Sequence, residues 1–158
     1  MNGNKGFTLV ELIIVIGIVG ILAAFSAPSF IEWSRNASYK EAANFALTAL
    51  RQGKSQAINL NQTVPVVFTL DSSAANTVNK VKIGTAPEIL FKKGIEIKRG
   101  PACDIENGTL SIAFNPTGSS GEGFICIFDG TEQKFRIGIA TPNTGRILLQ
   151  RWQGGAWK

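Results

Sequence analysis

The feature that most constrains this chain is a run of twenty uncharged residues from Leu12 to Ile31, mostly Ile, Leu, Val, Ala and Gly. As an α-helix, twenty residues measure about 30 Å, which matches the hydrocarbon thickness of a bilayer. Lys5 precedes the run, and basic residues favour the cytoplasmic side of a membrane. The sequence therefore predicts one membrane crossing, with a cytoplasmic N-terminus and an exported remainder.

Glu11 stands immediately before this apolar run. A carboxylate inside an apolar helix is costly near the bilayer centre and less costly at the interface, where Glu11 could simply lie at headgroup level. The alternative is a partner cation, and the uncut chain has none between Lys5 and Arg35. Cleavage between Gly6 and Phe7 would create one, because the new α-amine lies one helical turn from Glu11. In a bundle of such helices, the amine of one subunit could neutralise the Glu11 of its neighbour.

The segment Gly6-Phe7-Thr8-Leu9-Val10-Glu11-Leu12 resembles the class III signal sequence of type IV prepilins and type II secretion pseudopilins. This resemblance implies that an inner-membrane prepilin peptidase removes the leader, residues 1–6, and that Phe7 becomes N-methylated. It also implies that Glu11 directs assembly into a filament, and that Pro28 disrupts the helix.

Two other interpretations of the N-terminus remain. One is an uncleaved membrane anchor, since a single apolar span is common. The other is an ordinary secretory signal cut near Ala24-Phe25-Ser26, where small residues alternate. Ordinary signals do not place a carboxylate at the start of the apolar region, and they do not normally continue into a long helix.

After Pro28 the helical pattern resumes with one apolar face. Its apolar positions are Tyr39, Ala43, Ala46, Leu47, Leu50, Ala57 and Ile58, with Phe45 beside them. We therefore expect one helix from Phe7 to about Leu60, with a membrane or filament-core half (7–31) and an amphipathic half (32–60).

From residue 61 the pattern changes to short strands separated by turns. The predicted strands are Val64–Leu70, Val78–Ile83, Ile95–Lys98, Thr109–Phe114, Phe124–Asp129, Phe135–Ala140 and Arg146–Trp152. The expected fold class is α+β and pilin-like, with the long N-terminal helix packed against antiparallel sheets of a C-terminal head, residues 61–158.

Two further motifs narrow the resemblance. Phe114-Asn115-Pro116-Thr117-Gly118 and, near the C-terminus, Thr144-Gly145-Arg146 resemble the GspH/FimT family of minor pilins and pseudopilins. Their Pro and Gly residues are also what β-turns require. The Gly- and Ser-rich stretch of residues 116–123 predicts a flexible loop.

The two cysteines, Cys103 and Cys126, lie 23 positions apart in the β-rich part. An even pair in an exported chain is most simply a disulfide, which would contribute about 3 kcal/mol for a loop of this size. The alternative is two buried free thiols.

The composition argues against an enzyme. The chain has no His, so it lacks the commonest general base and metal ligand, and two Cys cannot form a four-thiolate zinc site. It also has no nucleophile–His–acid set and no phosphate-binding loop. We expect no catalytic residue, cofactor or metal.

DNA binding is the main rival function. Some FimT-like minor pilins take up DNA through a basic C-terminal Gly-Arg-x-Arg motif, and here Gly145-Arg146-Ile147-Leu148 keeps only the first Arg. Alternation along a strand puts Arg146 and Arg151 on opposite faces, whereas a DNA patch needs several cations on one surface. Trp152 and Trp157 could stack on bases. The candidate cations are Lys134, Arg136, Arg146, Arg151 and Lys158.

The preferred hypothesis is therefore a minor pilin or pseudopilin of a type IV pilus or a type II secretion system, in which it initiates, caps or modifies the filament. The resemblance implies as partners other pilin subunits through the N-terminal helix, the prepilin peptidase and an inner-membrane assembly platform. It implies a single-pass inner-membrane precursor with a periplasmic head that later enters the filament. The alternative is a FimT-like subunit acting in DNA uptake.

Overall fold

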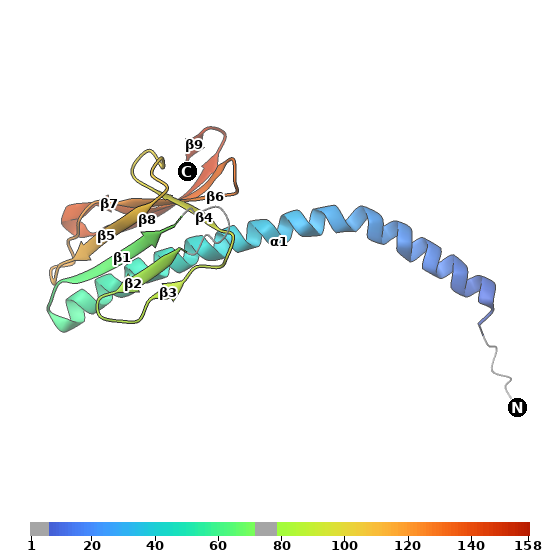
Figure 1. Cartoon of the computed structure of the whole chain (residues 1–158), viewed down its shortest axis with the longest axis horizontal. Helices are drawn as coiled ribbons and strands as arrows, with labels where there is room; N and C mark the ends of the chain where they lie inside the picture. The colour runs from blue at the N-terminus through green and yellow to red at the C-terminus, as the bar shows by residue number, and fades with distance from the viewer. Residues whose placement is uncertain (1–6, 72–78) are drawn as a thin grey trace, which may run out of the picture. The chain divides into compact units, whose positions relative to one another are not determined.

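The computed structural model describes residues 7–71 and 79–158, without the side chains of residues 26–28 (Figure 1). The chain divides into two compact units between Ala37 and Ser38. The first unit contains the N-terminal part of helix α1, Leu9–Leu60, and the second contains the rest of α1 with all the strands.

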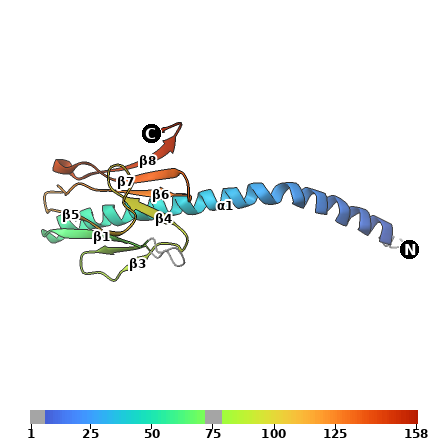
Figure 2. The ribbon, with the colours of Figure 1, turned by 45° about the horizontal axis from the view of Figure 1, so that its top comes forward.

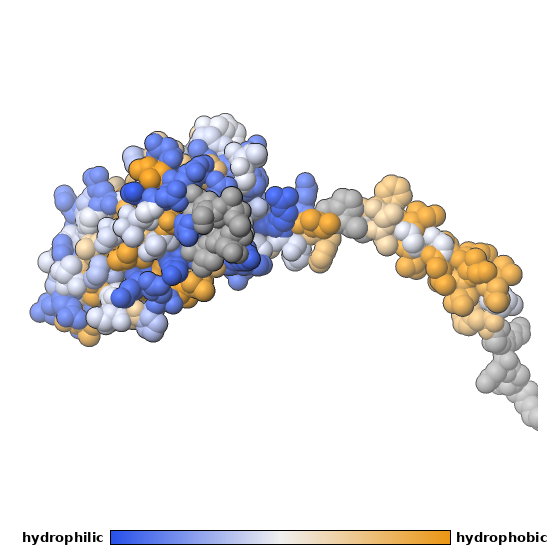
Figure 3. Space-filling model, in the orientation of Figure 1, coloured by the Kyte–Doolittle hydropathy of each residue, from blue (hydrophilic) through white to orange (hydrophobic). Residues whose placement is uncertain are grey.

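In the N-terminal unit, helix α1 carries no charged residue from Leu12 to Ile31, so apolar side chains lie on every side of this stretch. Its large apolar side chains are between 52% and 87% exposed, from Val15 to Phe7. Figure 3 shows them as a nearly continuous hydrophobic surface. A surface of this extent normally contacts lipid or another protein.

No single helix among the described residues is apolar over a long enough stretch to cross a membrane. The segments Leu9–Phe25 and Ser29–Leu60 meet the criterion only as a bent pair, by length and composition. Pro28 lies between them, in backbone that remains helical. Pro28 was expected to disrupt the helix, but its side chain lies outside the described residues.

The head contains two antiparallel sheets (Figures 1 and 2). The first has the order β3-β2-β1-β5, with β1 at Val64–Leu70, β2 at Lys80–Ile83, β3 at Ile89–Leu90 and β5 at Gly108–Phe114. The second has the order β4-β6-β7-β8-β9, with β4 at Glu96–Arg99, β6 at Phe124–Phe128, β7 at Gln133–Thr141, β8 at Arg146–Gln153 and β9 at Ala156–Trp157. A short 3-10 helix, Pro142–Thr144, joins β7 to β8.

All seven predicted strands are present, and Val64–Leu70 has the predicted bounds. Val78, the predicted start of β2, lies outside the described residues. The sequence prediction missed β3 and β9, because a two-residue strand shows no alternation. The predicted α+β fold class is confirmed, with a long N-terminal helix and antiparallel sheets.

The head half of α1 packs on the sheets through a face of small residues. Ala43, Ala46 and Ala57 are fully buried, together with Leu50. Gly53 lies on the same face, where a Cβ would meet the side chain of Val66 on β1. Small side chains thus let the helix approach β1 closely. The predicted core position Ile58 is wrong, since this side chain is 48% exposed.

Candidate functional site

The start of α1 is organised by Thr8 and Glu11. The Glu11 carboxylate accepts hydrogen bonds from the Thr8 backbone N–H and from its hydroxyl, both at 3.0 Å. In return the Glu11 N–H donates to Thr8 Oγ1 at 3.2 Å. This reciprocal arrangement is a capping box, which satisfies backbone donors at a helix start. Glu11 therefore has a structural partner within its own chain.

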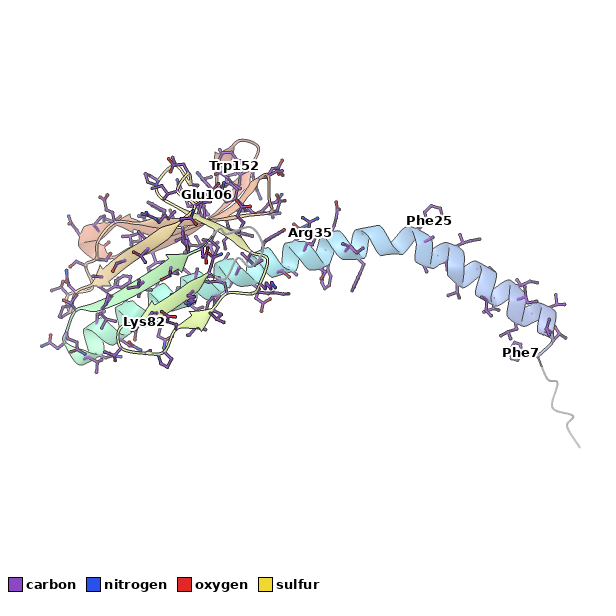
Figure 4. The ribbon with its side chains drawn as sticks, in the orientation of Figure 1. Phe7, Phe25, Arg35, Lys82, Glu106 and Trp152 are labelled. Atoms are coloured by element: carbon purple, nitrogen blue, oxygen red, sulfur yellow. A yellow bond between two sulfur atoms is a disulfide. The ribbon has the colours of Figure 1, made fainter. Side chains whose placement is uncertain are left out.

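The sequence analysis missed this role of Thr8, although the Thr8-x-x-Glu11 spacing is a readable signal. Hydrogen bonds to Thr8 leave the negative charge of Glu11 uncancelled. Within the described residues no Lys or Arg forms an ion pair with it. Phe7 is 87% exposed just before the helix (Figure 4), and Gly6 lies outside the described residues.

The five candidate DNA-binding cations do not form one patch. Lys134 Nζ pairs with Asp129 Oδ2 at 2.8 Å and with Glu132 Oε2 at 3.1 Å. The hydrogen bond between Lys134 and Asp129 raises the pKa of Lys134 and lowers that of Asp129. Lys134 is therefore already neutralised by its own loop and adds little positive potential for phosphates.

Arg136 is held between two aromatic rings on the outer face of the second sheet. Its guanidinium carbon lies 4.9 Å from the ring centre of Phe124 and 4.8 Å from that of Trp157. Its Nη2 and Nε also donate to Gln150 Oε1 at 2.6 and 3.2 Å. Burial lowers the pKa of Arg136, but an arginine remains charged. This side chain stabilises the C-terminal hairpin through cation–π contacts.

Trp157 also packs against neighbouring side chains. Its ring meets that of Trp152 edge-on, with centres 4.9 Å apart, and both rings are half-buried. Trp157 further packs against Phe128 and the cysteine pair. The two rings therefore cover part of each other's surface, which reduces the area available for base stacking.

Three of the five cations, Arg146, Arg151 and Lys158, are exposed. Arg151 lies opposite Phe135 of β7, so it shares the inward side of β8 with Ile147 and Leu149, as the alternation predicts. Backbone hydrogen bonds of 2.7 and 3.0 Å join Arg151 to Lys158. These two residues are therefore neighbours at the end of the sheet.

Cys103 and Cys126 form the expected disulfide, with their Cα atoms 5.7 Å apart. Cys126 is fully buried on β6, and Cys103 precedes β5 with only 4% of its surface exposed. The disulfide therefore ties the loop before β5 to the second sheet. Its role in the described head is structural.

The two motifs that resemble the GspH/FimT family meet in space. The Ser120 N–H donates to the Pro142 carbonyl at 2.8 Å, which joins the turn after β5 to the turn before β8. Gly145 has a φ of +53°, and a Cβ there would collide with the carbonyl oxygen of Gly118. These glycines are therefore required by backbone geometry.

Lys54 of α1 fastens this junction. Its Nζ donates to the carbonyls of Thr144 at 2.7 Å and Gly145 at 3.1 Å. On the other side, the Asn115 N–H donates to the Ser119 carbonyl at 2.8 Å. We call the turn after β5, the turn before β8 and Lys54 the motif junction. The prediction of a flexible loop at residues 116–123 is wrong, because backbone hydrogen bonds hold Gly118, Ser120, Gly121 and Gly123.

We predict that Lys54→Met lowers the stability of the head by about 1–2 kcal/mol, because two carbonyls lose a charged donor while the apolar stem is kept. Denaturant unfolding of the full chain in detergent, followed by tryptophan fluorescence, measures the change. Lys82→Met is the matched control, since Lys82 is exposed on β2. Equal loss in both variants would contradict the role of Lys54.

Comparison with known proteins shows which families resemble this chain. Residues 1–27 match the prokaryotic N-terminal methylation motif. The chain is 30% identical to the type IV major pilin protein PilE of Neisseria gonorrhoeae over 75% of its length and 61% of PilE. It is 50% identical to a fimbrial protein of Moraxella nonliquefaciens over 29% of its length and 30% of that relative. The chain thus spans less than two thirds of the length of these relatives.

The N-terminal motif, the relatives and the fold together make the chain similar to type IV pilins. Among solved structures, the chain resembles the type IV minor pilin FimU of Pseudomonas aeruginosa, with a TM-score of 0.54 and 15% identity. The match covers 80% of this chain and 96% of FimU, and it concerns the fold alone. The matched motif and the relatives belong to pilins, which are structural subunits, and this agrees with the expectation that the chain is not an enzyme.

Proposed function

We propose that this protein is a minor subunit of a type IV pilus or of a type II secretion pseudopilus. The observation that carries the proposal is the helix start: Phe7 and the Glu11 carboxylate stand at the head of a helix whose apolar side chains are exposed on all sides. Such a helix needs lipid before assembly and other helices after it. The minor role rests on the GspH/FimT-like motifs.

The proposed sequence of events begins in the inner membrane. The precursor crosses once, with its head in the periplasm, until the prepilin peptidase removes residues 1–6 and Phe7 is N-methylated. The assembly platform then moves the subunit out of the lipid. The α-amine of Phe7 on one subunit pairs with Glu11 of a neighbour, and the apolar segment 7–31 exchanges lipid for other pilin helices.

The Cys103–Cys126 disulfide supports a periplasmic head. Disulfides persist in oxidising compartments such as the bacterial periplasm and are rare in the cytosol. An exported head and a cytoplasmic leader also agree with Lys5 preceding the apolar run.

We predict that the native protein copurifies with sheared filaments at well below one copy per ten major subunits. Quantitative mass spectrometry of sheared filaments against an isotope-labelled standard of the head gives this ratio. A ratio near one would make the chain a major pilin. Its absence from every filament fraction would contradict the proposal.

DNA uptake remains the second candidate, favoured by the exposure of Arg146, Arg151 and Lys158. If these residues bind duplex DNA, affinity should fall steeply with salt, and Arg146→Ala with Arg151→Ala should weaken it at least about tenfold. Electrophoretic mobility shift of the full chain in detergent at two salt concentrations tests this. Unchanged binding by the double variant would remove the C-terminal face as the DNA site.

A further inference from the structure

The outer edge of β8 is only partly covered. β8 pairs with β7 along most of its length, but on the other side β9 pairs only with Trp152 and Gln153. Figure 2 shows β8 as the outer long strand of this sheet. Among the described residues, no strand pairs with residues 146–150 on that outer side.

The backbone hydrogen bonds of Arg151 show which residues of β8 point their N–H and C=O groups toward the open edge. Its N–H and C=O both point outward, because they bond to Lys158 at 2.7 and 3.0 Å. In an antiparallel strand, successive residues point their backbone groups to opposite sides, so Ile147 and Leu149 also point outward. Within the described part of the chain, no backbone hydrogen bond satisfies these outward groups. The edge therefore offers donors and acceptors in the spacing of a β-ladder.

A groove runs beside this edge. It has a volume of about 290 Å³ and is lined by Ile147 of β8 and by Arg51, Lys54, Ser55, Ile58 and Asn59 of α1. Ile58 is 48% exposed and Ile147 is half-buried, so the groove presents apolar surface next to cations. An added strand could place alternate apolar side chains there.

The charge around the edge has a single sign. Residues 135–158 contain Arg136, Arg146, Arg151 and Lys158 and no Asp or Glu, and residues 42–60 of α1 contain Arg51 and Lys54 with no acid. Arg146 and Arg151 stand at the two ends of the open stretch, and both are exposed. A cationic edge repels basic strands and attracts acidic ones.

We propose that the open edge of β8 binds an extended acidic segment of a partner protein by strand addition. The main chain of that segment hydrogen-bonds to Ile147 and Leu149. Its apolar side chains lie over the groove on the inward side of β8, and its carboxylates, on the opposite face of the added strand, lie near Arg146. A peptide fits better than a nucleic acid, because the edge presents carbonyl acceptors as well as N–H donors. A phosphate backbone offers no donors for those carbonyls.

This interaction does not depend on the filament role. The test uses the full chain in detergent micelles and a fluorescein-labelled peptide, acetyl-Glu-Val-Glu-Val-Glu-Val, measured by fluorescence anisotropy. We expect saturable binding that Arg146→Glu weakens at least about tenfold and that added salt weakens. Lys82→Glu is the matched control, since Lys82 is exposed on β2 of the other sheet and labelled in Figure 4. It should leave the affinity within about twofold.

Two further probes separate strand addition from charge attraction. The same peptide with N-methylated backbone amides keeps its charge but loses its main-chain donors, and it should bind at least about tenfold more weakly. A labelled twelve-residue oligothymidylate should bind more weakly than the peptide. Equal affinity for the methylated peptide, tighter binding of the oligonucleotide, equal loss with Lys82→Glu, or no peptide binding would each overturn the proposal.

Discussion

Replacing Glu11 by Gln is expected to reduce the amount of this protein in sheared filaments at least about tenfold while leaving it in the membrane. The substitution removes one negative charge and keeps a side chain that can accept the Thr8 hydrogen bonds. In the assembled bundle, the amine of a neighbouring Phe7 would then be buried without a counter-charge, which strongly destabilises a paired site. Quantitative immunoblotting of membrane and filament fractions measures both pools.

Two companion variants separate charge from helix capping. Thr8→Ala removes the capping hydroxyl and keeps the charge of Glu11, so it should lower incorporation by less than about threefold. Glu11→Ala removes both functions and should assemble no better than the Gln variant. If Glu11→Gln were incorporated normally while Thr8→Ala and Glu11→Ala lowered incorporation, the capping box would account for Glu11 and the charge pair would not.

Replacing Gly145 by Ala is expected to destabilise the head by about 2–5 kcal/mol. The left-handed backbone at φ +53° costs an alanine about 1–2 kcal/mol. The new Cβ would also collide with the Gly118 carbonyl oxygen, so the motif junction would have to separate. Overpacking of this kind adds about 1–3 kcal/mol. Urea unfolding of the full chain in detergent measures the loss.

Gly154 provides a matched control for the collision. It has a φ of +60°, close to that of Gly145, but no atom lies within 4 Å of a Cβ built there. Gly154→Ala should therefore show only the backbone cost of about 1–2 kcal/mol. Similar losses for the two variants would mean that the contact with Gly118 is unimportant.

Local patterns predicted most of the architecture. Twenty uncharged residues, a helical repeat of alanines and clean alternation such as Phe135, Ile137 and Ile139 each require only neighbouring positions to be read. The disulfide was predictable because the chain has only two cysteines. The capping box at Thr8 was equally readable from its spacing.

The side-chain contacts on the C-terminal face depend on residues that are far apart in the sequence. They could not be predicted from local patterns. Arg136 looked like a free cation, yet its environment is decided by Trp157, which reaches it only because the hairpin of β8 and β9 folds back. Lys54 likewise meets Gly145 across 91 positions of sequence. Neither contact leaves a periodic signal in the chain.

The most direct test of the proposed charge pair is the mass of the N-terminal peptide of the native protein recovered from sheared filaments. The account requires residues 1–6 to be absent and the peptide to begin with N-methylated Phe7, because only cleavage supplies the amine that can face Glu11 of a neighbour. A filament-borne chain that still begins at Met1 would contradict it.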